Sequence, residues 1–246
     1  MPYAPRTKLT DLPDGHPCGT CPVRPITICR GLEAATLAGL RALGTMQRLQ
    51  AGDSVFHEGD PAKRVFMVTH GALKLYTLLA DGRRQVTGFM FPGDFLGISV
   101  DEEYAFTVQA LEQSELWWFS REAFDRFLAE HPEVERELYR LAAHELAEAQ
   151  RQIVLLGRKA AHERLASFFL FLLRRSQRIS GMPGSSFDLP MSRIDIADYL
   201  GLTKETVSRM IAHLRGRGFI RLQSQNRVEV LDSDGLQAVA DGEGDG

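Results

Sequence analysis

Long apolar runs are missing from this 246-residue sequence. Its longest uninterrupted run, Phe168 to Leu173, ends at Arg174 and is far shorter than the roughly 18 residues that a membrane span requires. The first residues also lack the apolar core of a secretory signal peptide. We therefore expect a cytoplasmic protein without a membrane partner.

Motifs of enzymatic chemistry are absent as well. The sequence contains neither a nucleophile elbow nor a glycine-rich phosphate loop, and its histidines show no metal-ligand spacing, as expected of surface or capping residues. These absences predict that the protein is not an enzyme. A redox protein that uses the cysteine segment described below is a remote alternative.

The sequence also has little net charge, −3 at neutral pH, which by itself argues against a nucleic-acid partner. The distribution of the charges reverses that argument. Between Arg158 and Arg227, 13 lysines and arginines stand against 5 acidic residues, whereas the rest of the chain holds 16 basic and 27 acidic residues. Because only the basic region can offset phosphate charge, the two regions are expected to differ in function.

A candidate recognition helix lies in the basic region. Thr203 is a good N-cap, and Val207, Ile211 and Leu214 then recur at helical spacing, so one face is expected to be buried. Gly218 is expected to end the helix. The opposite face is polar and carries Lys204, Glu205, Ser208, Arg209 and His213.

A shorter helix is predicted at 192–200, where Ser192 and Asp195 have capping-box spacing. Ala197 is small enough for two helices to cross closely, and Gly201 follows at the turn. This is helix-turn-helix spacing, in which the second helix enters the major groove of DNA. Segments 219–222 and 228–230, joined by polar residues at 225–227, predict a two-stranded wing behind it.

The region from about 49 to 119 has a different texture. Short apolar runs alternate with glycine turns, and Gly-Asp pairs recur at 52–53, 59–60 and 93–94. This pattern predicts a small β-barrel of the jelly-roll type. A short helix is expected at 121–130.

A long helix at about 133–156 carries an apolar seam with alternating steps of four and three residues. Packing against the barrel would explain part of this seam, but alternation over three heptads is typical of a parallel coiled-coil dimer. Gly157 is expected to be a hinge before the next helix, at 159–177. The alternation runs from Tyr139 to Ala160, and the dimer seam within it comprises Ala142, Leu146, Ala149, Ile153 and Leu156.

The overall prediction is an α+β fold with a jelly-roll barrel, a dimerisation helix and a winged helix-turn-helix. The expected organisation is a cysteine segment at 1–30, the barrel at 31–132, the dimerisation helix at 133–157, the DNA-binding domain at 158–235 and a disordered tail at 236–246.

The three cysteines of the protein are Cys18, Cys21 and Cys29. Their odd number and a cytoplasmic setting argue against a structural disulfide. Thiolates gathered this closely suit zinc or an iron–sulfur cluster. The spacing alone leaves a set of free thiols equally open.

The order of barrel, long helix and winged helix resembles the CRP/FNR family of bacterial transcription regulators. The resemblance covers nearly the whole chain and rests on three segments: Gly-Asp-Phe-Leu-Gly at 93–97, Leu-Leu-Gly-Arg-Lys at 155–159 and Tyr-Leu-Gly-Leu-Thr-Lys-Glu-Thr-Val-Ser-Arg at 199–209. It implies a cyclic-nucleotide-binding-like barrel, a homodimer, double-stranded DNA as ligand and RNA polymerase as a partner.

The resemblance also assigns roles within the recognition helix. FNR-type members carry Glu-x-x-Ser-Arg, which corresponds to Glu205, Ser208 and Arg209. A glutamate can accept a hydrogen bond from cytosine, a serine can contact either base of a pair, and an arginine can bridge the two acceptors of guanine. An inverted repeat of the TTGAT/ATCAA kind is implied. Phosphate contacts are expected from Thr203, Lys204, Arg215, Arg217, Arg221 and Arg227.

The signal that controls the protein is inferred from two other segments, one that departs from family members and one that matches them. Members that bind cyclic AMP have an arginine for the phosphate after the Gly-Asp-Phe turn, whereas here no arginine follows until Arg121, so no cyclic nucleotide is expected. The cysteines resemble the C-x2-C-x7-C segment of the oxygen-sensing FNR branch, where a [4Fe–4S] cluster is bound by three such residues and a fourth cysteine in the barrel. That implies an activator controlled by oxygen or redox state.

The fourth cysteine is missing from this sequence. Trp117 and Trp118 occupy the place where it would lie. A regulator without a cluster, constitutive or otherwise controlled, is therefore the alternative. Candidate substitute ligands are His16, Asp94, Asp101, Glu112 and Glu115.

Overall fold

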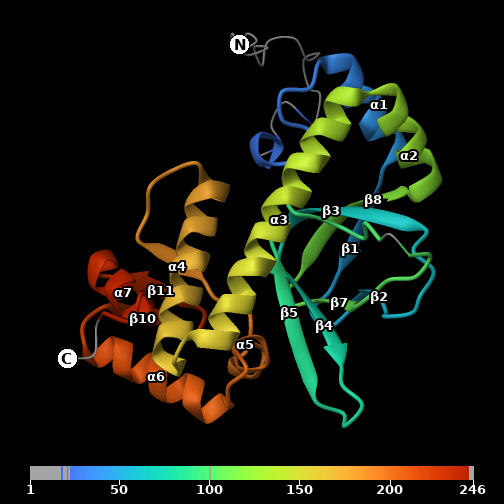
Figure 1. Ribbon diagram of the computed structural model, residues 1–246. Coiled ribbons are helices and arrows are strands. Elements are labelled where there is room, and N and C mark those ends of the chain that lie inside the picture. Colours follow the sequence, from blue (N-terminus) through green and yellow to red (C-terminus); the bar gives the residue numbers. More distant parts are fainter. Residues whose placement is uncertain (1–17, 19–20, 22, 100, 244–246) are drawn as a thin grey trace. The chain divides into compact units, whose positions relative to one another are not determined.

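The computed structural model describes residues 18, 21, 23–99 and 101–243. The chain divides into two compact units, Met1–Leu73 with Met90–Glu145 and Lys74–Phe89 with Leu146–Gly246. Figure 1 labels most of their helices and strands. Residues 1–17 of the predicted cysteine segment, which include the candidate ligand His16, lie outside the described residues.

The barrel is confirmed as a β-rich domain with antiparallel pairing (Figure 1). Its strands follow the order β1-β8-β3-β6 in one sheet and β2-β7-β4-β5 in the other. They are β1 (Thr45–Leu49), β2 (Ser54–Phe56), β3 (Arg64–His70), β4 (Leu73–Leu78), β5 (Arg84–Met90), β6 (Phe95–Leu96), β7 (Thr107–Ala110) and β8 (Ser114–Ser120).

The recurring Gly-Asp pairs make the turns between these strands. In each pair the aspartate side chain accepts a hydrogen bond from the backbone N–H three residues earlier. The distance is 2.8 Å for Asp53 with Gln50, for Asp60 with His57 and for Asp94 with Phe91. The carboxylate thus satisfies a backbone donor that the turn leaves without a strand partner.

Helices cover one end of the barrel. The short helix predicted at 121–130 is confirmed as α2 (Arg121–Glu130), whereas α1 (Ala34–Leu43) and the 3-10 helix η2 (Arg24–Ile26) were not predicted. Helices α1 and α2, residues 28–32 and the barrel share a hydrophobic core with the beginning of α3 (Pro132–Arg158). The core contains Ile28, Leu32, Leu37, Leu40, Val65, Met67, Phe95, Phe119, Phe124, Phe127, Val134 and Leu141.

The long helix is confirmed, but the expected hinge at Gly157 is wrong by two residues. Helix α3 continues through Gly157, and the helical backbone breaks at Lys159 and Ala160. Lys159 Nζ donates to the carbonyl oxygen of Ala240 at 2.7 Å and to Ser167 Oγ at 2.9 Å. The helix therefore ends next to Lys159, whose side chain is held by two hydrogen bonds, and not at Gly157. No helix in the described part of the chain is long and apolar enough to cross a bilayer.

The second unit contains the winged helix-turn-helix. The capping box is confirmed, because Ser192 Oγ accepts from Asp195 N at 3.1 Å and Asp195 Oδ2 accepts from Ser192 N at 3.0 Å. The predicted wing gains a third strand, β9, in the order β10-β11-β9. The elements are α4 (Ala161–Ser180), β9 (Ser186–Asp188), α5 (Arg193–Leu200), α6 (Lys204–Gly216), β10 (Ile220–Ser224) and β11 (Arg227–Val230).

The expectation of a disordered tail at 236–246 is wrong for residues 236–240. Residues Ser233–Ala240 form helix α7, which packs against α4. Its N-cap Asp232 accepts from Gly235 N at 2.8 Å. Leu236, Val239 and Ala240 are buried along one face, so three apolar residues at helical spacing outweigh the acidic, glycine-rich composition. Residues 244–246 lie outside the described chain.

Candidate functional site

The proposed reading helix α6 presents its polar face to solvent. Thr203 is the N-cap and accepts from Thr206 N at 3.2 Å. Val207, Ile211 and Leu214 are buried on the opposite face, as predicted. Because they fix the rotation of the helix, Glu205, Ser208 and Arg209 are left exposed on the polar face.

The side chains on that face differ in how far they are engaged. Ser208 Oγ donates to the Lys204 carbonyl oxygen at 3.0 Å, and Arg209 Nη2 lies 3.4 Å from Thr206 Oγ1. These contacts are local and solvent-exposed, so they are readily exchanged for contacts to a ligand. The helix can therefore offer a carboxylate, a hydroxyl and a guanidinium to a groove.

The basic residues around this face fall into two groups. Lys204 and Arg215 are exposed on α6, and Arg217 lies over the Phe219 ring at 5.4 Å from its centroid. In the wing, Arg221 pairs with Glu229 at 3.4 Å and Arg227 with Asp188 at 3.0 Å. The two wing arginines would have to share their charge with these carboxylates, and are the weaker candidates for phosphate contacts.

The cysteines lie on one cavity in the first unit. Cys18, Cys21 and Cys29 all line a space of about 390 Å³ that also reaches β3 and β8. The pKa of the Cys29 thiol is raised to about 11, mainly by burial and to a smaller extent by the nearby Cys18 and Cys21, while the hydrogen bond with Thr27 and the charge of Arg24 act to lower it. The fold thus gathers the thiols that the sequence places in one segment.

These thiols are not closed into a binding geometry. Among the described residues, no group of three or more His, Cys, Asp or Glu side chains is arranged to hold a metal ion. The chemistry of the donors is nevertheless suited to a thiolate-bound group. Arg24, whose charge acts on Cys29, also has a buried Nη1 without a hydrogen-bond partner in the described chain.

The candidate fourth ligands can be divided into those that line this cavity and those that do not. Glu115 lines it, two residues before Trp117 and on the same face of β8, whereas Asp94, Asp101 and Glu112 are not among its lining residues. His70 lines it as well and pairs in register with Glu115 across β3 and β8. The sequence did not single out His70, because only strand pairing brings residue 70 beside residue 115.

The two tryptophans have different environments. Trp117 lines the cysteine cavity with the Arg41 guanidinium 4.9 Å from its ring centroid. Trp118 points to the other face of the strand, where Arg64 lies 4.2 Å from its ring centroid. Strand alternation therefore puts an indole, which has no metal-binding lone pair, into the cavity that the thiols line.

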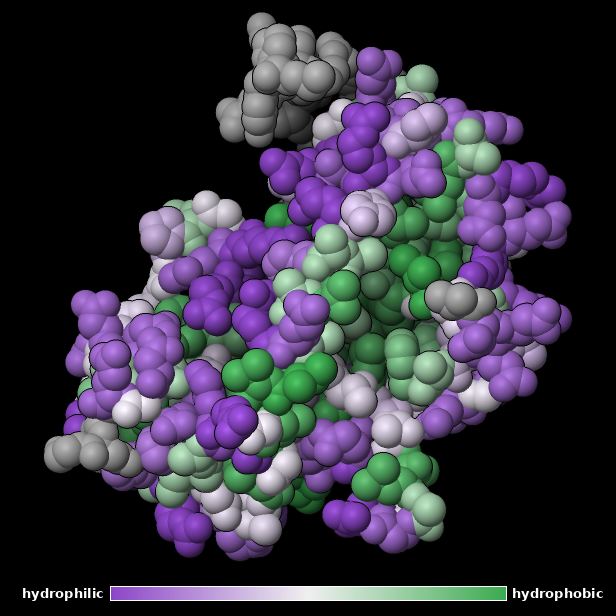
Figure 2. Space-filling model, in the orientation of Figure 1, coloured by the Kyte–Doolittle hydropathy of each residue, from purple (hydrophilic) through white to green (hydrophobic). Residues whose placement is uncertain are grey.

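The apolar seam of α3 is exposed. Leu146 is 61% and Ile153 71% exposed, and Ala142 and Ala149 are also exposed, while Leu156 is half-buried. Figure 2 shows hydrophobic surface over the C-terminal half of α3. A row of exposed apolar side chains at alternating spacing is a surface suited to a second copy of the helix.

Comparison with known proteins agrees with this architecture. Residues 46–131 match the cyclic nucleotide-binding domain, and residues 163–239 match the Crp-like helix-turn-helix domain. The chain is 40% identical to the nitrogen fixation regulation protein FixK of Bradyrhizobium diazoefficiens, over 93% of this chain and 95% of that protein. It is 35% identical to the transcriptional activator protein FnrL of Cereibacter sphaeroides, over 94% of each.

A solved structure also has a similar fold. The structure of FixK2 from Bradyrhizobium japonicum is similar with a TM-score of 0.74 and 33% sequence identity. The similarity covers 80% of this chain and 96% of that chain. It therefore includes nearly the whole of the solved protein.

Proposed function

The chain belongs to the CRP/FNR family of transcription regulators, in the branch that includes FixK and FNR, and we propose that it reads a TTGAT/ATCAA-like inverted repeat as a homodimer. The observation that carries this proposal is the exposed set of Glu205, Ser208 and Arg209 on α6. Two copies of α6 related by a dyad would enter successive major grooves about one DNA turn apart.

Each residue of the set has a distinct task. The Glu205 carboxylate accepts from cytosine N4, the Arg209 guanidinium donates to guanine O6 and N7, and Ser208 contacts a neighbouring base. Lys204, Arg215 and Arg217 contact phosphates and fix the position of the helix. Transcription activation makes RNA polymerase a further partner.

The test of this reading compares two arginines on one helix. Arg209→Ala is expected to cost about 1–3 kcal/mol of binding free energy and to relax base preference at one position of each half-site. Arg215→Ala is expected to weaken all duplexes alike and to lower the slope of log K against log salt by about 1. Equal weakening of all sequences by Arg209→Ala would make it a phosphate contact and contradict the proposed role.

We further propose that the cysteine cavity holds an iron–sulfur cluster of the [4Fe–4S] type. Cys18, Cys21 and Cys29 would be its sulfur ligands, and His70 or Glu115 would be the fourth. When bound, such a cluster supplies an oxidation-sensitive group. The support is that the three thiols and these two side chains line one cavity, and that Arg24, whose charge acts on Cys29, has a buried nitrogen without a partner in the described chain.

The residues around the cavity connect it to α3. Cys29 packs against the hydrophobic core of the first unit, which includes Val134 and Leu141 of α3. Thr36 Oγ1 of α1 also donates to Glu133 Oε1 at 3.2 Å. A change in the packing of segment 23–32 would therefore act on the beginning of the dimerisation helix, and so on the population that binds DNA.

The barrel is proposed to have no role in binding cyclic nucleotides, although it matches the domain of that name. The first arginine after the Gly93–Gly97 turn is Arg121, whose guanidinium donates to the Ser99 carbonyl oxygen and lies near Asp125. A cyclic phosphate would thus compete with protein partners for its counter-charge.

Purification without air, followed by iron and sulfide analysis, tests the cluster. Iron and sulfide in the parent protein would support the proposal. A lower iron and sulfide content in the His70→Ala or the Glu115→Ala variant would identify the fourth ligand. Iron-free protein that binds the repeat equally with and without air would contradict the proposal. That result would favour the alternative of a regulator without a cluster, which the exposed apolar seam and Trp117 at the cavity also support.

A Cys18→Ser, Cys21→Ser, Cys29→Ser variant separates the ways in which a cluster would act. A monomeric variant would implicate the thiols in dimerisation. A dimer would leave them an allosteric role.

A further inference from the structure

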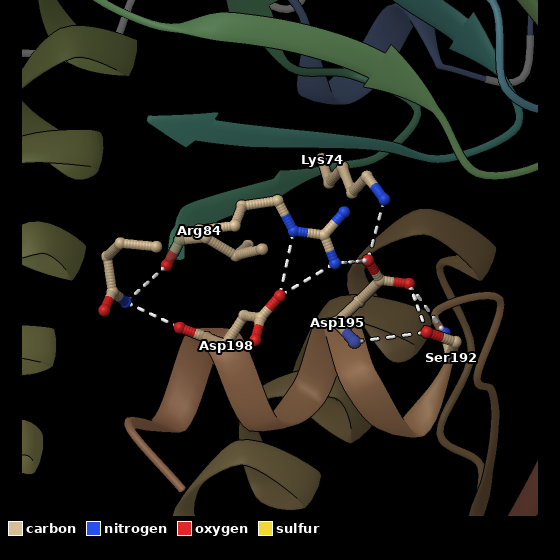
Figure 3. A network of polar contacts seen from close by, with 7 residues as sticks. Lys74, Arg84, Ser192, Asp195 and Asp198 are labelled. Atoms are coloured by element: carbon tan, nitrogen blue, oxygen red, sulfur yellow. Dashed lines mark hydrogen bonds and ion pairs between the residues drawn. The ribbon is translucent and has the colours of Figure 1, made fainter. Parts of the chain in front are cut away.

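Helix α5 is tied to the β4–β5 hairpin by an ion-pair network within the second unit (Figure 3). Lys74 Nζ lies 2.7 Å from Asp195 Oδ1. The Arg84 guanidinium reaches both carboxylates of α5, at 2.9 Å from Asp195 Oδ1 and 2.7 Å from Asp198 Oδ2. Two basic side chains from the hairpin thus hold two carboxylates on one face of a helix more than a hundred residues further along the chain.

The central pair of this network is buried. The side chains of Lys74 and Asp195 are 8% and 7% exposed. Burial opposes the charge on Asp195, yet hydrogen bonds from Lys74 and Ser192 keep its pKa below the ordinary value. A buried carboxylate in this setting depends on its partners, so the position of α5 is coupled to the position of the hairpin.

The C-terminal end of α5 is held by side chains from three other elements. Gln85 of β5 donates to the Asp198 carbonyl oxygen at 2.7 Å, and Gln152 of α3 donates to that of Tyr199 at 2.9 Å. Arg164 of α4 donates to the Leu200 carbonyl oxygen at 2.8 Å. Three consecutive carbonyl groups at the end of the helix are therefore satisfied from outside it.

Aromatic packing joins the same elements. The ring of Phe89, at the end of β5, lies 5.0 Å from that of Tyr199 and 5.8 Å from that of Phe168 in α4. Helix α5 has only eight residues and would not be stable alone, so these contacts determine where it lies. Since Gly201 and Leu202 lead directly into the N-cap of α6, they also determine where the reading helix begins.

We propose that Arg84 and Lys74 are positioning residues for DNA reading, which hold α5 and thereby aim α6 at the groove. The inference rests on the proposed function of α6. None of the network residues lies on the face with Glu205, Ser208 and Arg209, so the hairpin can hold the helix-turn-helix without covering its reading face.

An alternative role for Arg84, direct contact with DNA, predicts that the Asp198→Asn variant changes DNA affinity in the opposite direction. If Arg84 contacted a DNA phosphate, Asp198 would only compete with that phosphate, and Asp198→Asn would strengthen binding. If Arg84 positions α5, Asp198→Asn breaks the tie and weakens binding even though it removes a negative charge. The sign of this effect separates positioning from simple charge attraction.

The experiment measures the affinity of the full chain for the inverted repeat and for a scrambled duplex. Arg84→Gln is expected to weaken specific binding about tenfold, because it loses the contacts with both Asp195 and Asp198, and Asp198→Asn is expected to weaken it by less. The double variant is expected to lose little more than Arg84→Gln, which already breaks the contact with Asp198. Arg83→Gln is the matched control, since Arg83 pairs with Asp81 in the hairpin turn and not with α5. The salt slope is expected to stay at the parental value in all three.

Arg84 and Asp198 are chosen because their side chains are 25% and 23% exposed, so their variants are expected to fold, as a thermal melt would verify. Amide hydrogen exchange of residues 193–216, measured without DNA, is the independent readout. It is expected to be faster in Arg84→Gln and Asp198→Asn and unchanged in Arg83→Gln.

The outcomes separate the two proposals. Parental affinity, or tighter binding, for Asp198→Asn would overturn the positioning role. A parent chain that does not prefer the repeat over the scrambled duplex would refute the proposed function instead. Even if the parent chain shows no such preference, unchanged amide hydrogen exchange in Arg84→Gln and Asp198→Asn would still overturn the positioning role.

Discussion

Gly93→Ala tests whether the barrel turn at 93–97 supports the cysteine segment. Gly93 has a φ of 101°, and an added Cβ would lie 2.7 Å from Ile26 Cδ1 and 2.8 Å from Ile26 Cγ1. The turn cannot simply move away, because Gly93 N donates to the Val68 carbonyl oxygen at 2.9 Å. Since Ile26 lies in η2, between Cys21 and Cys29, the collision falls on the cysteine segment.

The expected magnitude follows from two contributions. A positive φ costs alanine about 1–2 kcal/mol relative to glycine. The collision with Ile26 adds about 1–3 kcal/mol, as is usual when a packed region must accept an extra carbon. Gly52 is a matched control, because its φ is 92° and nothing lies within 4 Å of an added Cβ, so Gly52→Ala carries the first cost alone.

The assay combines urea unfolding with thiol labelling of Cys29, followed by mass spectrometry of the labelled peptide. Gly93→Ala is expected to be less stable than Gly52→Ala by about 1–3 kcal/mol and to label Cys29 faster than the parent. Gly52→Ala should label Cys29 at the parental rate. Equal stability of the two variants, with parental labelling in both, would refute the idea that the turn supports the segment.

Three further predictions concern the helices. Ile153→Glu, which changes an exposed seam residue, is expected to give a folded monomer by light scattering, and a dimer of parental affinity would contradict the seam. Leu236→Ala, which opens a cavity under α7, should lower the free energy of unfolding by about 2–5 kcal/mol, whereas a dispensable tail would lose almost nothing. Thr203→Ala should remove about 1 kcal/mol of stability by leaving the Thr206 N–H uncapped, as measured by urea unfolding. An unchanged midpoint would argue against that cap.

Local signals in the sequence predicted the DNA-reading element well. The N-cap Thr203, the buried Val207, Ile211 and Leu214 and the capping box of α5 are all confirmed, because they involve residues within one or two helical turns. The tail was predicted wrongly from its composition. Leu236 and Val239 form a helix there because α4 offers an apolar surface, and the composition contains no sign of that surface.

The cysteine cavity shows where the sequence alone was insufficient. It supplied three thiols in one segment and a list of carboxylates, but it gave no means of ranking them. The register of β3 and β8 decides that His70 and Glu115 line the same cavity as the thiols, and strand alternation decides that Trp117 lines it while Trp118 does not.

The sequence by itself thus determined the class of protein, helix α6 of the helix-turn-helix and the apolar row on α3, because periodicity and capping act over a few residues. Only the tertiary structure decided which side chains share the cysteine cavity and that Lys74 and Arg84 hold α5. Those contacts join residues about 40 to 120 positions apart in the chain, and strand pairing and packing, which bring them together, leave no local pattern.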